Sequence, residues 1–215
     1  MRDPKSSAAS PRAASALGGT RESGASPPAD PLAFARTYLA TTADVVSRID
    51  ANELADLIGL VAEARQAKRH IFICGNGGSA TTASHFAAGL GKDGSYGRPE
   101  RFRTLALTDN VAWLTALAND AHYSQVFVEQ LRNFASKGDL LITFSSSGNS
   151  ENVIRAVEWA NDNDLVTVGV TGSPGGALAA LAQRCLVVDS PHIGYVEDAH
   201  FVIQHLVSYY FIEGA

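Results

Sequence analysis

Five short apolar runs, separated by segments with helical spacing, constrain the fold of this chain more than any other feature. The runs are HIFIC at 70–74, RTLAL at 103–107, LLITF at 140–144, LVTVGV at 165–170 and CLVVD at 185–189. They are largely apolar instead of alternating with polar residues, which is typical of parallel strands that helices cover on both faces. We therefore predict an α/β fold with a doubly wound, five-stranded parallel sheet flanked by helices.

Two helices are expected before the first strand, because apolar residues between Leu32 and Arg69 recur three and four positions apart. Residues 1–31 hold five of the eight prolines and almost no large apolar residue, which predicts a disordered tail. A targeting leader is the alternative for this segment, although its acidic residues weigh against it. The expected organisation is a tail over 1–31 and one domain over 32–215.

Charge and composition exclude several classes of partner. A net charge of −5 on 215 residues gives no general field that attracts phosphate backbones, so neither nucleic acid nor an anionic membrane is expected to bind. The sequence contains no run of 18 apolar residues and no apolar core of a secretory signal, so we expect a cytoplasmic protein. Cys74 and Cys185 lie inside apolar runs, where reduced, buried thiols are the common outcome.

The turn after the first predicted strand, Cys74-Gly75-Asn76-Gly77-Gly78-Ser79, has the composition of an anion-binding site. Its three glycines allow backbone N–H groups to face one point, and the helix that follows adds the positive end of its dipole. The spacing does not match the G-x-G-x-x-G pattern, so no nucleotide cofactor is expected. The alternative is a tight strand-to-helix turn whose small residues serve packing alone.

A second turn places four hydroxyls after the third predicted strand, at Ser145, Ser146, Ser147 and Ser150. Hydroxyls and free N–H groups at the start of a helix can donate to phosphate oxygens. One serine as a helix N-cap is ordinary, and that role alone is the alternative for Ser150. Four hydroxyls in six residues exceed what capping requires. The loop at 171–176 either borders the same crevice or is only a connection.

Together with the segments at 107–109, 118–120, 171–176 and 197–200, these turns resemble the sugar isomerase (SIS) domain family, and within it the phosphoheptose isomerase branch. The resemblance extends from about residue 34 to the C-terminus. It implies a homotetramer, with active sites between subunits, that converts sedoheptulose 7-phosphate into a heptose 7-phosphate. It implies that the sugar phosphate is bound at Asn76, Gly77, Gly78, Ser79, Asp109, Asp120, Ser145, Ser146, Ser147 and Ser150.

The chain departs from this family at the position of a catalytic carboxylate. The family carries a His and, four residues later, a Glu that can also ligate zinc; here the His is matched by His85, but the Glu falls on Gly89. On the last helix the family has a Gln and, eight residues later, a catalytic His; these positions hold Glu197 and His205. Lys92 and Asp93 lie where the family has a substrate-contacting Arg. The resemblance therefore implies that Glu197 and His205 are the catalytic pair.

Helix geometry is compatible with that pairing. Positions eight apart on a helix differ by about 80° in direction, so Glu197 and His205 can face one cleft. With His85 they form a reasonable three-ligand set for zinc or another divalent metal. The alternatives are that His85 and His200 are partly buried histidines with backbone partners, and that Glu197 stabilises the start of the last helix through its dipole.

Two functions follow from these observations. The first is a ketose–aldose isomerase acting on a seven- or eight-carbon sugar phosphate, in heptose or specialised sugar biosynthesis. The second is a non-catalytic phosphosugar-binding adaptor or regulatory protein, which the loss of the Glu at Gly89 would explain. We favour the enzyme, because a retained histidine and a displaced carboxylate indicate relocated chemistry. A homo-oligomer is expected, because the first two helices and the aromatic last helix carry more apolar surface than one sheet can cover.

Overall fold

The computed structural model describes residues 27–214. The tail predicted over 1–31 lies outside this part of the chain as far as residue 26, and the first helix already begins at Pro31. Asp30 caps that helix, since its side chain accepts hydrogen bonds from the N–H groups of Leu32 and Ala33 at 2.9 and 3.2 Å. No helix in this range is long and apolar enough to span a bilayer.

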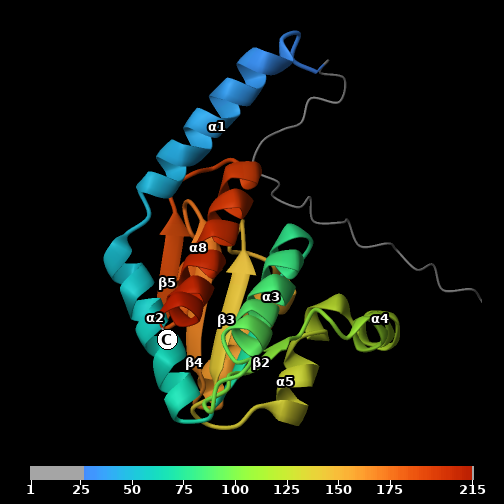
Figure 1. Cartoon of the computed structure of the whole chain (residues 1–215). Helices are drawn as coiled ribbons and strands as arrows, with labels where there is room; N and C mark the ends of the chain where they lie inside the picture. The colour runs from blue at the N-terminus through green and yellow to red at the C-terminus, as the bar shows by residue number, and fades with distance from the viewer. Residues whose placement is uncertain (1–26, 215) are drawn as a thin grey trace, which may run out of the picture.

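A five-stranded sheet forms the centre of the fold, as predicted (Figure 1). All neighbouring strands are parallel, in the order β2-β1-β3-β4-β5. The strands are β1 (His70–Cys74), β2 (Arg103–Ala106), β3 (Leu140–Ser145), β4 (Val166–Gly172) and β5 (Arg184–Val188).

Helices connect the strands and precede the first of them. The two expected N-terminal helices are α1 (Pro31–Ser47) and α2 (Ala51–Gln66). The remaining helical elements are α3 (Gly78–Ala88), the π-helical turn η1 (Gly89–Asp93), α4 (Val111–Asp120), the 3-10 turn η2 (Tyr123–Gln125), α5 (Val128–Phe134), α6 (Glu151–Asp162), α7 (Gly176–Leu181) and α8 (Ile193–Glu213).

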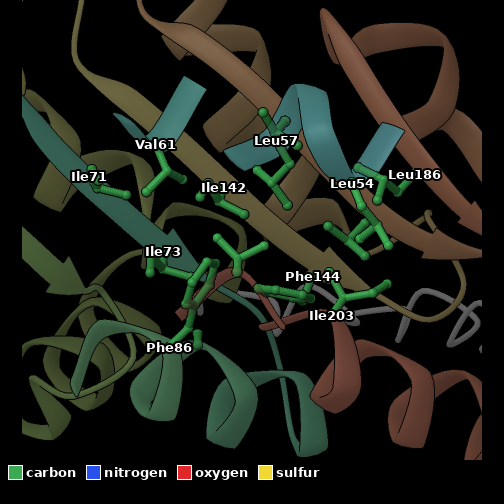
Figure 2. Close-up of a cluster of buried hydrophobic side chains, with 14 of the residues drawn as sticks. Leu54, Leu57, Val61, Ile71, Ile73, Phe86, Ile142, Phe144, Leu186 and Ile203 are labelled. Carbon is green, nitrogen blue, oxygen red and sulfur yellow. The ribbon is translucent and has the colours of Figure 1, made fainter. Parts of the chain in front are cut away.

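Both faces of the sheet are covered, which explains why the strands are apolar throughout. Side chains of successive strand residues point to opposite faces. Ile71 and Ile73 thus join the core under α2, α3 and α8, where Figure 2 shows them with Phe86 and Ile203. Phe72 and Cys74 belong to the second core, under α5, α6 and α7. Cys74 and Cys185 are free thiols on β1 and β5, which other strands separate.

The strand order reverses between β1 and β3, and this reversal defines the position of the site. From β1 the chain continues outward to β2, whereas from β3 it continues the other way to β4. The helices that follow β1 and β3 consequently cover opposite faces of the sheet, α3 on one and α6 on the other. In open α/β sheets such a switch point leaves a crevice at the carboxyl ends of the strands, where ligands bind.

Candidate functional site

The first turn is built so tightly that only glycine fits at Gly75. A Cβ there would lie 2.7 Å from the Cβ of Ser79 and 2.8 Å from the carbonyl oxygen of Phe144. Gly77 has a positive φ of 55° and provides no side-chain cap for α3. No side chain makes a capping hydrogen bond to the N–H groups at the start of α3.

Asn76 is held in place by a pair of amide hydrogen bonds. Its Nδ2 donates to Oδ1 of Asn152 and its Oδ1 accepts from Nδ2 of Asn152, both at 2.8 Å. The hydroxyl of Tyr123 donates to the same Oδ1 of Asn76 at 2.9 Å. Asn152, which is 2% exposed, thus ties the first turn to the first residues of α6. Sequence reasoning missed Asn152 and Tyr123; the available signal was an Asn on the buried side of an amphipathic helix.

Contacts with the loop at 171–176 fix the conformation of the second, serine-rich turn. Gly148 has a φ of 64°, and a Cβ at this position would lie 2.0 Å from the carbonyl oxygen of Gly175. The N–H of Leu178 donates to the carbonyl of Gly148 at 2.9 Å, and that of Ala177 to Oδ1 of Asn149 at 3.0 Å. The loop at 171–176 therefore borders the crevice and supports its serine-rich wall.

The serine hydroxyls lie at different depths. Ser79 and Ser145 are each 4% exposed, whereas Ser147 is exposed and Ser146 partly so. Ser150 occupies the N-cap position of α6 but makes no side-chain capping bond. Its oxygen instead lies 3.3 Å from Oγ of Ser145, which donates to it. The hydroxyl of Ser150 is thus left available for a ligand, and capping alone does not account for this residue.

Glu197 reaches the first turn from α8. A Cβ on Gly78 would lie 2.6 Å from the carboxylate atoms of Glu197, so the carboxylate packs directly on the start of α3. Burial raises the pKa of Glu197, and the charge of Asp198 raises it further. Asp198 itself accepts a 2.7 Å hydrogen bond from the hydroxyl of Tyr38 on α1. Because α8 begins at Ile193, Glu197 lies beyond the first turn and is not a dipole cap.

His85 on α3 and His205 on α8 lie about two helical turns after Gly78 and Glu197, and their imidazole rings meet there. Nε2 of His205 lies 3.2 Å from Nε2 of His85, and the ring of Phe201 lies edge-on to both. The partner of exposed His85 is therefore an imidazole, not the backbone group expected as the alternative. Burial and the neighbouring His85 lower the pKa of His205. His200 is fully buried beside the ring of Phe144.

The two predicted aspartates differ in their relation to the crevice. Asp109 follows β2 and accepts a hydrogen bond from the hydroxyl of Ser84 on α3, so it lies at the same edge of the sheet. Asp120 is exposed at the end of α4 and accepts from Nδ2 of Asn119 at 2.8 Å. Among the described residues, no hydrogen bond connects Asp120 with the two turns.

The predicted metal ligands are brought together only in part. His85 and His205 are adjacent, whereas the carboxylate of Glu197 packs on Gly78 at the other end of α3. Between residues 27 and 214, no three His, Cys, Asp or Glu side chains are grouped so as to hold a metal ion. The three-ligand set is therefore not assembled within one chain.

Fold and turns together define a doubly wound α/β protein with glycine- and serine-rich turns at its topological switch point. Residues 37–172 match the family model of the SIS domain. The chain belongs to the SIS domain family.

Several relatives of this chain are phosphoheptose isomerases. The phosphoheptose isomerase of Crocosphaera subtropica is 40% identical over 158 residues, which are 72% of this chain and 78% of the relative. That of Rhodospirillum rubrum is 34% identical over 175 residues, covering 80% of this chain and 92% of the relative.

Solved structures of phosphoheptose isomerases share the fold of this chain. A phosphoheptose isomerase from Francisella tularensis superposes with a TM-score of 0.80 at 27% identity, covering 86% of this chain and 99% of the other. Phosphoheptose isomerase GmhA from Neisseria gonorrhoeae gives a TM-score of 0.78 at 29% identity, with the same coverage.

Proposed function

We propose that this protein is an aldose–ketose isomerase that acts on a phosphorylated ketose, with sedoheptulose 7-phosphate as its substrate. The observation that carries the proposal is the contact between Glu197 and Gly78, which places a carboxylate inside an anion-binding crevice. The relatives named phosphoheptose isomerase, which share most of the chain, support the choice of a seven-carbon sugar.

In this account, the phosphate binds between the two turns. Hydroxyls of Ser147 and Ser150 donate to its oxygens, and the starts of α3 and α6 contribute N–H groups and the positive ends of their dipoles. The buried hydroxyls of Ser79 and Ser145 form the floor. A cradle of neutral donors suits a chain whose net charge is −5, because it needs no basic patch.

Isomerisation needs one group that removes a proton from carbon and one that donates to the carbonyl oxygen. Removal of a proton from C1 of the ketose leaves an electron pair that forms the C1–C2 double bond of an enediol, while the C2 oxygen takes up a proton. Return of a proton to C2 and loss of the C1 hydroxyl proton give the aldose, and no oxidant is consumed. Glu197, with its raised pKa, is assigned as the base, and His205 as the partner acid.

The spacing along α8 favours a site shared between two copies of the chain. Glu197 and His205 are eight residues apart, or about 12 Å along the helix axis. In one copy, the carboxylate of Glu197 packs on Gly78, whereas the imidazole of His205 lies against His85, seven residues or about 10 Å further along α3, so the two groups do not converge on neighbouring carbon atoms. A site that combines Glu197 of one copy with His205 of another removes this difficulty and accords with the homotetramer expected from the sequence.

Exposed apolar side chains on α1 and α8 supply surface for such contacts. Leu32 and Leu39 on α1 are 59% and 70% exposed, and Tyr209 and Tyr210 on α8 are 50% and 58% exposed. Figure 1 shows α1 rising beyond the carboxyl ends of the strands, the edge at which the crevice lies. Apolar patches of this kind mark interfaces between proteins.

Complementation between two inactive variants tests the shared site. Glu197→Gln and His205→Ala are each unfolded and then refolded together. If the two residues meet across an interface, some sites in the mixed oligomer contain both wild-type groups and activity returns. If one chain supplies both residues, the mixture stays as inactive as each variant refolded alone.

Zinc stays a prediction. His85 and His205 are adjacent, but Glu197 lies apart from them, and the proton transfers above use no metal. A cytoplasmic location accords with a substrate whose phosphate prevents passage across membranes.

The second candidate is a phosphosugar-binding regulatory protein without turnover, and Gly89 at the place of the family Glu favours it. The Vibrio vulnificus NanR protein complexed with ManNAc-6P shares the fold, with a TM-score of 0.63 at 20% identity. Binding of a sugar phosphate without exchange of its C–H protons in deuterated water would select this function over the isomerase.

A further inference from the structure

A cavity of about 360 Å³ lies beside the histidine pair, between the end of α3 and the last turns of α8. Its lining includes Gly89, Asp93, Gln204, His205, Ser208 and Tyr209. We refer to it as the Gly89 pocket. Its volume falls at the low end of small-molecule sites and would hold about ten water molecules.

Two polar side chains in this pocket are buried without a partner. Gln204 is 0% exposed, and neither its amide nitrogen nor its amide oxygen has a hydrogen-bond partner within residues 27–214. Ser208 is 2% exposed, and its hydroxyl also lacks a partner in that range. The two residues are one turn apart on α8 and line the same cavity. Buried polar groups are normally satisfied, so these atoms indicate a polar occupant.

Glycine at position 89 keeps this pocket open. A Cβ at this position would lie 2.8 Å from Oγ and 3.2 Å from Cβ of Ser208. A larger side chain would displace Ser208 or fill the pocket. Gly89 is also the first residue of the π-helical turn η1, a type of irregularity that is frequent at functional sites. The glycine at position 89 therefore leaves room beside the buried hydroxyl of Ser208.

The chemistry of the lining favours hydroxyl groups over an anion. An amide, two hydroxyls and an imidazole can each donate and accept, as a polyol does. Asp93, whose side chain is 45% exposed, would repel phosphate, although Lys92 pairs with it at 2.5 Å. We propose that the Gly89 pocket binds the hydroxyl-bearing carbon chain of the sugar phosphate, and that Gln204 and Ser208 select for a long chain.

This inference rests on the proposed function, including its shared site. The pocket lies between seven and 11 residues after Gly78, or about 10–16 Å along α3, because His85 and Gly89 both line it. Most of it is therefore further from the phosphate cradle of the same copy than a seven-carbon chain extends. His205 lines the pocket and is assigned to the site of a neighbouring copy. The composite site thus takes the cradle and Glu197 from one copy, and His205 with the Gly89 pocket from another.

Binding measurements on the full-length oligomer test the proposal. Calorimetry gives Kd for sedoheptulose 7-phosphate, ribulose 5-phosphate and inorganic phosphate with wild type, Gln204→Leu and Ser208→Ala. Loss of neutral hydrogen bonds should weaken binding of the seven-carbon compound about three- to tenfold. Binding of the five-carbon compound and of phosphate should stay unchanged. Gln66→Leu, an exposed site at the end of α2, is the matched control and should change none of them.

Thermal stability separates binding from a structural role. Removing orphaned polar atoms should leave Tm of the unliganded Gln204→Leu protein unchanged or higher. A lower Tm with unchanged affinity would overturn the proposal, as would seven-carbon binding by both variants equal to that of wild type. If wild type binds phosphate but no seven-carbon sugar phosphate, the proposed function fails together with the pocket. If wild type binds the sugar and the variants bind it equally, only the pocket assignment fails.

Discussion

Replacing Ser150 by alanine separates ligand binding from helix capping. Serine at an N-cap usually bonds to the helix, and its loss then costs about 0.5–2 kcal/mol of stability. Ser150 makes no capping bond, and its nearest hydroxyl partner, Ser145, is a weak one at 3.3 Å. The variant should therefore unfold within about 2 °C of wild type.

The same hydroxyl is assigned to the phosphate, so its loss should appear in affinity. A hydrogen bond to a charged group contributes about 1.5–3 kcal/mol. Kd for sedoheptulose 7-phosphate should consequently rise about ten- to a hundredfold, and Kd for inorganic phosphate by a similar factor.

Asp50→Ala is the complementary control, because it should lower stability without changing affinity. The side chain of Asp50 caps α2 by accepting from the N–H of Asn52 at 2.8 Å, on a helix that contributes nothing to the crevice. This variant should lose about 1 kcal/mol of stability and keep full affinity. Calorimetric titration and thermal unfolding of the three proteins suffice. A Ser150→Ala protein that is less stable but binds with wild-type affinity would refute the assignment.

Three further outcomes are expected. Glu197→Gln and His205→Ala should each lower turnover about 10²- to 10⁴-fold while the protein still binds phosphate; wild-type turnover in either would remove that residue from the catalytic pair. Gly89→Glu should inhibit instead of improving turnover, because its Cβ would lie 2.8 Å from Oγ of Ser208; a gain in activity would contradict this. Burial lowers the pKa of His200 from 6.5 to about 4, so stability should be complete above pH 6.5 and fall by about 3 kcal/mol toward pH 4. Urea unfolding should show this fall in wild type but not in His200→Leu.

The sheet was predictable because helices bury its strands on both faces. The run at 70–74 coincides with β1, and the run at 103–107 differs from β2 by one residue. The run at 165–170 is too short for β4, which continues to Gly172. Thr171 pairs with Ser145 and Gly172 with Val188, and both extra residues belong to the turn region, whose polar composition hides strand pairing.

The crevice was predictable in position but not in detail. Two glycine- and serine-rich turns that follow strands were expected to lie together, since parallel strands end at one edge of the sheet, and the structure brings them to that edge. The amide pair of Asn76 and Asn152 and the contact of Glu197 with Gly78 join segments that are remote in sequence. No local periodicity encodes such contacts. The Gly89 pocket likewise depends on how η1 packs against α8. The sequence showed only that a glycine stands at the position of the family Glu.

The central claim is that this chain moves a proton between two carbons of a phosphorylated ketose. Purified wild-type protein incubated with sedoheptulose 7-phosphate in deuterated water, followed by NMR, tests it directly. The account predicts that the aldose 7-phosphate accumulates with deuterium at C2, and that Glu197→Gln abolishes most of this signal. A substrate that binds tightly but neither isomerises nor exchanges a C–H proton would contradict the account.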